Sequence, residues 1–223
     1  MLDVSSFSHL SLDPETTVDK IAAELRRALF DGELEPGTPL REVALADSLG
    51  VARSTVREAL GSLVADGLAV RVANKGVAVS TPDPGVIHDV TRARTVLEVA
   101  GVRRWAEAAE TDRQAVRDAL AAYAELASTD FTTAAWNQAH LAIHRAFVGL
   151  TGSERLVAAA DALAGEIRLA LAKVDRTRRN ATEQVASHAL LVDLLEAGRT
   201  DDAADELVRH LADGETSMAA ALT

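Results

Sequence analysis

The segment LREVALADSLGVARSTVREALGSLVADG, residues 40–67, decides how the N-terminal part of this chain folds. Apolar residues recur at helical spacing on both sides of Leu49-Gly50-Val51, which predicts two short helices joined by a tight turn. Glycine adopts the left-handed conformation that ends many helices at the least cost, so Gly50 suits this turn.

The second of these helices begins with polar residues. Arg53, Ser54, Thr55 and Arg57 all lie off its apolar face. In a helix-turn-helix, the exposed N-terminal end of the second helix contacts phosphates and base edges. These four residues are therefore candidate DNA contacts. The alternative is an ordinary helical hairpin with a solvated polar end.

The neighbouring segments favour DNA binding. Residues 68–72 and 77–79 alternate around a polar turn, which predicts a β-hairpin whose tip carries Lys75 and Gly76. Upstream, an amphipathic helix is expected from residue 17 to near Gly32. We therefore expect a winged helix-turn-helix of three helices plus a hairpin over residues 17–80. Residues 1–16 are expected to form a loose arm.

The sequences GELEPGTPL, LADSLGVARSTVREAL, LVADGL and NKGVAV resemble the winged-helix domain of the GntR family of bacterial transcription regulators. The usual core there is LGVSRTPVREAL. Arg53 and Arg57 match its two arginines, whereas Ser54 replaces its threonine and Thr55 its proline. The resemblance implies operator contacts by these four residues and a wing tip at Gly76. Val43 stands where relatives often have a DNA-contacting arginine, so one contact is expected to be missing.

The composition agrees with a helical regulator. Hydrophobic residues make up 48% of the 223 residues and aromatic residues 3%, which favours a mostly α fold. The net charge is −11, so the chain is not a polycation that coats nucleic acid, although residues 53–76 hold four cations and two acids. One weakly basic module would bind DNA poorly, whereas a symmetric homodimer could read an inverted-repeat operator.

Several other classes are disfavoured. The absence of cysteine excludes disulfides and thiolate metal sites. We find no signal-peptide pattern at the N-terminus and no apolar run of membrane-spanning length, so a cytoplasmic protein with no membrane partner is expected.

The chain after the hairpin reads as helical throughout. Residues 81–85 are the expected linker, and residues 86–223 an antiparallel bundle of about six helices. We expect these at about 86–109, from Thr111, and at 132–150, 153–178, 183–197 and 201–220. Thr111 with Gln114 resembles a capping box, and Gly198 is a plausible helix end.

Four histidines fall on inward positions of this bundle: His140, His144, His188 and His210. The first two are four residues apart on one helix, close enough to bind one metal ion, and the other two lie on separate helices. A shared ion would satisfy one nitrogen of each buried ring. The alternative is four core histidines with ordinary partners.

A second resemblance favours the metal. HLAIHRAFVGLTGSERL is similar to the effector-binding FCD domain of the FadR-like branch of the GntR family. This implies metal ligation by His144, His188 and His210, with His140 where aspartate is common. Four neutral imidazoles leave a divalent ion with charge +2, which suits Zn²⁺ or Ni²⁺ and attracts anions. Whether the ion keeps open positions is left undecided.

Arg94 is the candidate effector residue. The sequence ARTVLE resembles the start of the FCD domain, where an arginine can hold an effector carboxylate bidentately. The alternative is a surface ion pair with Glu98 at i+4.

The favoured hypothesis is a dimeric DNA-binding transcription repressor, with double-stranded DNA and a small organic acid as partners, and no enzyme activity. Two alternatives remain: a regulator for which the metal itself is the effector, and a metal-dependent hydrolase. No catalytic carboxylate or nucleophile stands out near the histidines, which counts against the hydrolase.

Overall fold

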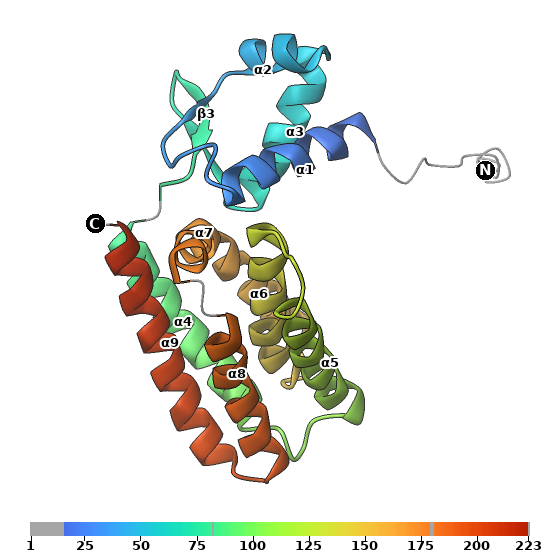
Figure 1. Cartoon of the computed structure of the whole chain (residues 1–223), viewed down its shortest axis with the longest axis vertical. Helices are drawn as coiled ribbons and strands as arrows, with labels where there is room; N and C mark the ends of the chain where they lie inside the picture. The colour runs from blue at the N-terminus through green and yellow to red at the C-terminus, as the bar shows by residue number, and fades with distance from the viewer. Residues whose placement is uncertain (1–15, 82, 179–180, 223) are drawn as a thin grey trace, which may run out of the picture.

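The computed structural model describes residues 16–81, 83–178 and 181–222, and it places a small N-terminal head on one end of a helical bundle (Figure 1). The mostly helical fold class is confirmed. The expected arm at residues 1–15 lies outside the described residues. Thr16 is described, and its side chain caps the first helix by accepting a hydrogen bond from the Asp19 amide.

The head contains the expected three helices and hairpin. Its helices and strands are α1 (Thr17–Phe30), β1 (Pro39–Leu40), α2 (Glu42–Leu49), α3 (Arg53–Ala65), β2 (Ala69–Val72) and β3 (Gly76–Val79). The two-residue strand β1 was not predicted. It pairs antiparallel with β3, so the sheet has the order β1-β3-β2.

The turn between α2 and α3 forms as the sequence indicated. Gly50 has φ 66° and ψ 34°, and its amide donates to the Ala46 carbonyl. Beyond the turn, Val56, Leu60 and Leu63 on α3 are fully buried against α1 and the sheet. This packing leaves the opposite face and the N-terminal turn of α3 in solvent.

The bundle has the expected six helices within the described residues. They are α4 (Pro84–Val102), α5 (Glu110–Leu126), α6 (Thr133–Gly149), α7 (Glu154–Arg178), α8 (Ala181–Glu196) and α9 (Thr200–Leu222). Gly198 has φ 72° and follows the end of α8, as predicted. None of the described helices is both long enough and apolar enough to serve as a membrane span.

Two local predictions in the bundle were wrong. The first helix ends at Val102 rather than near 109, because the chain turns to bury Trp105, which is only 5% exposed. The predicted capping box of Thr111 and Gln114 does not form. Ala109 occupies the cap position of α5, and the Gln114 side chain instead donates to Asp118.

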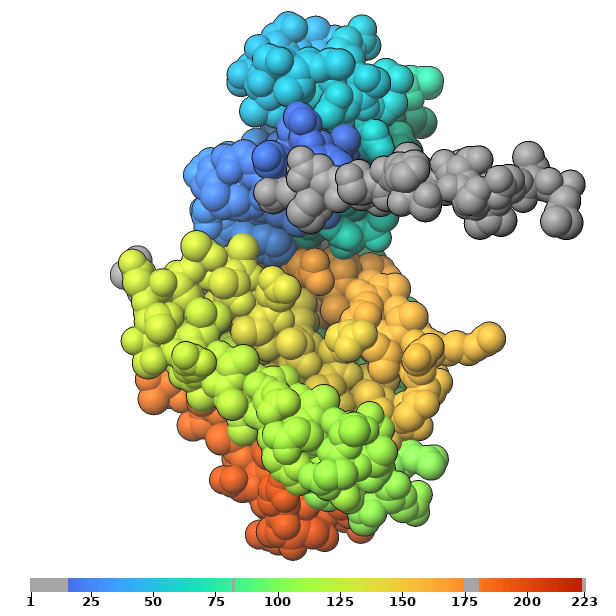
Figure 2. All heavy atoms as spheres, turned by 90° about the vertical axis from the view of Figure 1, so that its right-hand side faces the viewer, coloured from blue at the N-terminus to red at the C-terminus, as the bar shows by residue number. Residues whose placement is uncertain are grey.

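The head and the bundle meet at the corner that follows α3. Leu169 and Ala172 of α7 are buried in the core of the head. Figure 2 shows the head seated over the ends of α6 and α7. Asp66 and Gly67 lie against Gly165 so closely that a Cβ atom on Gly165 would be 2.7 Å from the Asp66 carbonyl oxygen. The two parts therefore touch backbone to backbone.

Candidate DNA-reading surface and metal centre

The predicted DNA contacts on α3 are at its free end. Arg53 and Ser54 are exposed in the first turn, and Thr55 is half-buried. The C-terminal end of α3 touches the bundle, so its first turn lies at the far end of the head (Figure 1). No side chain caps this helix start, which leaves backbone N–H groups suited to a phosphate.

Arg57 differs from its neighbours because it is already paired. Its Nε and Nη2 donate to the two carboxylate oxygens of Glu42 on α2, at 2.9 and 2.6 Å. These bonds hold the pKa of Glu42 below its usual range, and Arg53 and Arg71 act in the same direction. The pairing joins residues 15 positions apart, and no local pattern predicts it. Arg57 remains a predicted contact, positioned by Glu42.

The wing tip is open. Lys75 and Gly76 are both exposed, and nothing lies within 4 Å of the place where a Cβ atom of Gly76 would be. Asn74 has φ 60° and Gly76 φ 89°, which produces the tight turn between β2 and β3. Their roles as DNA contacts remain predictions.

The four predicted histidines come together in the bundle. His140 and His144 of α6 meet His188 of α8 and His210 of α9, and one ring nitrogen from each lies within 4.8 Å of all the others. Nε2 of His144 is 3.2 Å from Nε2 of His140 and 3.3 Å from Nε2 of His188. The spacing on α6 predicted that His140 and His144 would lie together, whereas His188 and His210 were predicted from their inward positions on two other helices.

The donor set fits a divalent metal ion. Nitrogens bound about 2.0–2.1 Å from one tetrahedral zinc ion lie roughly 3.3 Å apart, close to the two distances between facing Nε2 atoms. Four imidazoles without a thiolate or a direct carboxylate match zinc or nickel better than magnesium or calcium. These four imidazole donors are the histidines that the sequence pattern singled out.

Three of the rings have a hydrogen-bonding partner at Nδ1. Nδ1 of His144 contacts Glu98 Oε2 at 2.7 Å, Nδ1 of His188 contacts the Gln184 carbonyl at 2.7 Å, and Nδ1 of His210 contacts Ser187 Oγ at 3.0 Å. Carbonyl and carboxylate acceptors behind an imidazole place its proton on Nδ1 and leave Nε2 as the ligand atom.

Burial keeps the rings ready to bind metal. It lowers the pKa of His188 to about 3, and it lowers the pKa values of His140 and His144 well below the usual range. The pKa of His210 is also lowered by burial. The rings are therefore neutral at pH 7, so few protons compete with a metal there.

Arg94 forms the ion pair that the sequence suggested, but the pair is buried rather than on the surface. Its Nε donates to Glu98 Oε1 at 2.8 Å, and the two side chains are 8% and 2% exposed. Nη2 of Arg94 is buried and has no hydrogen-bond partner among the described residues. Arg94 also lines a cavity of about 220 Å³ beside His144, so the ion pair and a ligand role are compatible.

Glu98 is the functional residue that sequence reasoning missed. Its spacing suggests only a pairing with Arg94, yet its other oxygen contacts Nδ1 of His144, 46 positions away. Burial raises the pKa of the Glu98 carboxyl, and the Arg94 charge opposes that change. Only the i+4 spacing from Arg94 was visible in the sequence, and it gave no sign of the histidine contact.

Comparisons with known proteins agree with both halves of the molecule. Residues 17–79 match the family model described as bacterial regulatory proteins, gntR family, and residues 89–213 match the FCD domain. The chain is 29% identical over 177 residues to the Nta operon transcriptional regulator of Aminobacter aminovorans, which covers 79% of this chain and 82% of that protein.

Two further comparisons cover most of the chain. The "Probable D-xylose utilization operon transcriptional repressor" of Paenarthrobacter nicotinovorans is 31% identical over 186 residues, 82% of this chain and 80% of that protein. A solved structure from Rhodococcus sp. RHA1, described as a GntR transcriptional regulator, is 29% identical with a TM-score of 0.75, covering 91% and 97% of the two chains. The relatives and the fold are those of regulators, so the hydrolase alternative is not supported. The chain belongs to the GntR family of bacterial DNA-binding transcription regulators and carries a C-terminal FCD domain.

Proposed function

We propose that this regulator is a homodimeric repressor that binds an inverted-repeat operator in the cytoplasm and leaves it when a small carboxylate binds the bundle. Each head contributes Arg53, Ser54, Thr55, Arg57, Lys75 and Gly76. Repression is supported by the repressor name of the Paenarthrobacter relative. Two heads are needed because each offers few cations to the phosphates.

The metal centre carries the proposal. Four buried imidazoles converge with facing nitrogens 3.2 and 3.3 Å apart, and the structure supplies partners behind three of them. His140, His144, His188 and His210 would hold the ion, most suitably Zn²⁺, with Ni²⁺ as the second choice. When bound, the ion supplies positive charge at the end of the cavity that Arg94 lines.

Arg94 is the proposed carboxylate anchor. A guanidinium N–H that is buried without an acceptor is costly, and a ligand carboxylate would satisfy it. The cavity of about 220 Å³ is smaller than the roughly 300–1,000 Å³ of drug-sized ligand sites, which fits a small organic acid.

The experiment begins with metal analysis of untagged protein. A thermal-shift screen of small carboxylic acids then follows, with and without a chelator, and the best acid is tested for its effect on DNA affinity. We expect about one zinc ion per chain and an acid-dependent rise in melting temperature that Arg94→Gln removes. Protein with neither bound metal nor any response to acids would refute the effector half.

A regulator that responds to the metal itself is the second candidate. A separate cavity of about 200 Å³ is lined by His140, His188 and His210 together with Glu206 and Asp213, so cations can approach the cluster from an acidic side. DNA affinity that follows zinc concentration and ignores organic acids would favour this candidate.

A further inference from the structure

The cavity beside His144 is lined by one more arginine than it has carboxylates, because Glu98 and Asp161 also line it. It lies between α4, α6 and α7, and Arg94, Arg145 and Arg168 all line it. Arg145 is occupied, because its Nε donates to both oxygens of Asp161 at 3.0 and 3.1 Å. Arg94 is bound to Glu98 through its Nε and keeps only Nη2 for a ligand, whereas Arg168 has its Nε to offer.

Both of these arginines have a buried donor without an acceptor. Nη2 of Arg94 and Nε of Arg168 have no hydrogen-bond partner among the described residues. Unsatisfied buried N–H groups of charged side chains are costly. They come from different helices, α4 and α7, and each needs an acceptor of its own. Two anionic groups in one ligand would satisfy both.

Arg168 also faces the head. With Gln138, it lines a second cavity of about 550 Å³ whose other walls include Arg26, Arg27 and Asp66 of the head. Burial lowers the pKa of the Arg168 guanidinium, and the negative charge of Asp66 opposes that change. Arg168 is therefore shared between the ligand cavity and the contact between head and bundle.

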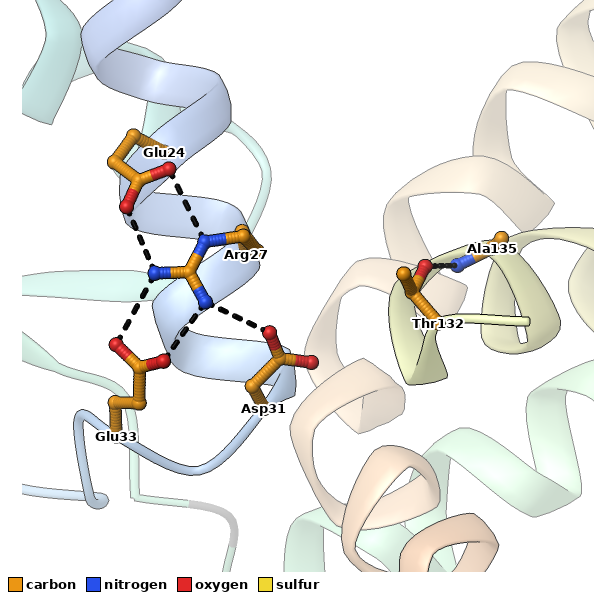
Figure 3. Close-up of polar contacts among 6 residues, drawn as sticks. All are labelled: Glu24, Arg27, Asp31, Glu33, Thr132 and Ala135. Carbon is orange, nitrogen blue, oxygen red and sulfur yellow. Dashed lines mark hydrogen bonds and ion pairs between the residues drawn. The ribbon is translucent and has the colours of Figure 1, made fainter. Parts of the chain in front are cut away.

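The other two arginines of that contact are already paired. Arg26 donates to Asp66 at 2.7 and 2.9 Å and to Ser62 at 2.7 Å. Arg27 is surrounded by three carboxylates, shown opposite the capped start of α6 in Figure 3: Glu24, Asp31 and Glu33. Arg168 is thus the cation of this contact whose hydrogen bonds are uncommitted.

The position of Arg168 on α7 links it to the reading helix. Gly165, one turn earlier, lies directly against Asp66 and Gly67, where α3 ends. A change in the charge around Arg168 therefore acts on the same turn of α7 that supports the end of α3.

We propose that the ligand of this cavity is a small dianion, with one anionic group on Arg94 and the second on Arg168, and that its hold on Arg168 loosens the end of α3 from α7. The inference rests on the proposed effector function and names its ligand class. The dianion compensates the charge of Arg168 and so weakens the attraction between Arg168 and Asp66. A monoanion held by Arg94 occupies the cavity without this effect, because coupling requires different affinities for the two states.

The ligand class is tested by calorimetry on zinc-loaded full-length protein. Succinate and glutarate are compared with butyrate and valerate, which match them in carbon number. We expect the better diacid to bind about 10- to 100-fold more tightly than its monoacid, as one charge-assisted contact implies. Arg168→Gln should remove this advantage and leave the monoacid unchanged, Arg168→Lys should keep part of it, and Arg155→Gln on the exposed side of α7 should keep all of it.

The coupling is tested by hydrogen exchange of the amides of residues 66–68. The diacid should raise their exchange rate in the wild type, the monoacid should not, and Arg168→Gln should abolish the response. Asp66→Asn should raise exchange without any ligand and, because the coupling is reciprocal, tighten diacid binding.

Three results would overturn the inference: equal affinity for both acids of a pair, diacid binding that ignores Arg168, or bound diacid without any change at residues 66–68. If monoacids and diacids bind equally and both need Arg94, the proposed function survives and only the dianion inference fails. If neither acid binds, both fail.

Discussion

Glu98→Gln tests whether the buried chain Arg94–Glu98–His144 supports the metal centre. The carboxylate has one oxygen for each neighbour, at 2.8 Å from Arg94 Nε and 2.7 Å from His144 Nδ1. Both neighbours present N–H groups, whereas an amide offers one acceptor oxygen and one NH₂ group. In either orientation of the glutamine, one contact therefore becomes donor against donor.

Two magnitudes follow from this geometry. Losing the support behind a ligand histidine lowers metal affinity about 10- to 100-fold, or about 1.4–2.7 kcal/mol. Removing the charge also leaves Arg94 buried without a counter-ion, which costs about 3–5 kcal/mol of folding free energy. With side chains 8% and 2% exposed, the pair is little screened by water. The loss of folding free energy is therefore the larger of the two effects. It is a substantial part of a total stability of about 5–15 kcal/mol.

Two measurements separate these effects. Competition with a chromophoric chelator gives zinc affinity, and urea denaturation of chelator-treated protein gives the free energy of unfolding. Glu125→Gln on the exposed face of α5 is the matched control and should change neither. Wild-type zinc affinity together with a wild-type urea midpoint in Glu98→Gln would refute the role of Glu98.

Three further perturbations test the other parts of the molecule. His188→Ala removes one proposed ligand, so a chelator should lower the melting temperature of the wild type but not of the variant; an equal response of both would mean that His188 is not a ligand. Arg53→Ala should weaken DNA binding and reduce the salt slope by about 1 per head, measured by fluorescence anisotropy at several salt concentrations, and an unaltered slope would exclude a phosphate contact. Gly165→Ala places a Cβ atom 2.7 Å from the Asp66 carbonyl oxygen and should lower the free energy of unfolding by about 1–3 kcal/mol. The control Gly214→Ala has open space around its Cβ atom and should be neutral or stabilising. Equal urea midpoints for the two variants would show that the head does not pack tightly against α7.

Local patterns predicted most of the fold. The αL glycine at Gly50, the alternation around the wing turn and the four histidines on inward faces depend on residues near one another in sequence. The misplaced end of α4 shows the limit of this reasoning. Residues 103–108 contain no proline or glycine, and the helix stops there because burying Trp105 outweighs local helix propensity.

Long-range contacts were beyond the sequence. Strand β1 is two residues long and exists only because β3 lies beside it. Glu98 contacts His144, which is 46 positions away in the sequence, and Arg57 contacts Glu42, which is 15 positions away. No local sequence pattern points to Arg168, because the two cavities that it lines are formed by helices that only tertiary packing brings together. Ligands on one helix are predictable from periodicity, whereas the residues that support them are set by the packing of different elements.

The pairing of charges in the head explains why the contact between head and bundle matters for regulation. Within residues 16–81, Arg26, Arg27 and Arg57 are bound to carboxylates, while Lys20, Arg41, Arg53, Arg71 and Lys75 have no ion pair. Each phosphate contact changes the logarithm of affinity by about 0.9 per tenfold change in salt. The unpaired cations of α3 and the hairpin, Arg53, Arg71 and Lys75, therefore give one head weak binding. The net charge of −11 weakens it further. The proposed dimer would supply useful affinity by placing two heads at the spacing of two half-sites, and that spacing would depend on how each head sits on α7. In the proposed dimer, a ligand that tilts the heads at the junction of Gly67 and Gly165 would release the second half-site without altering any DNA contact.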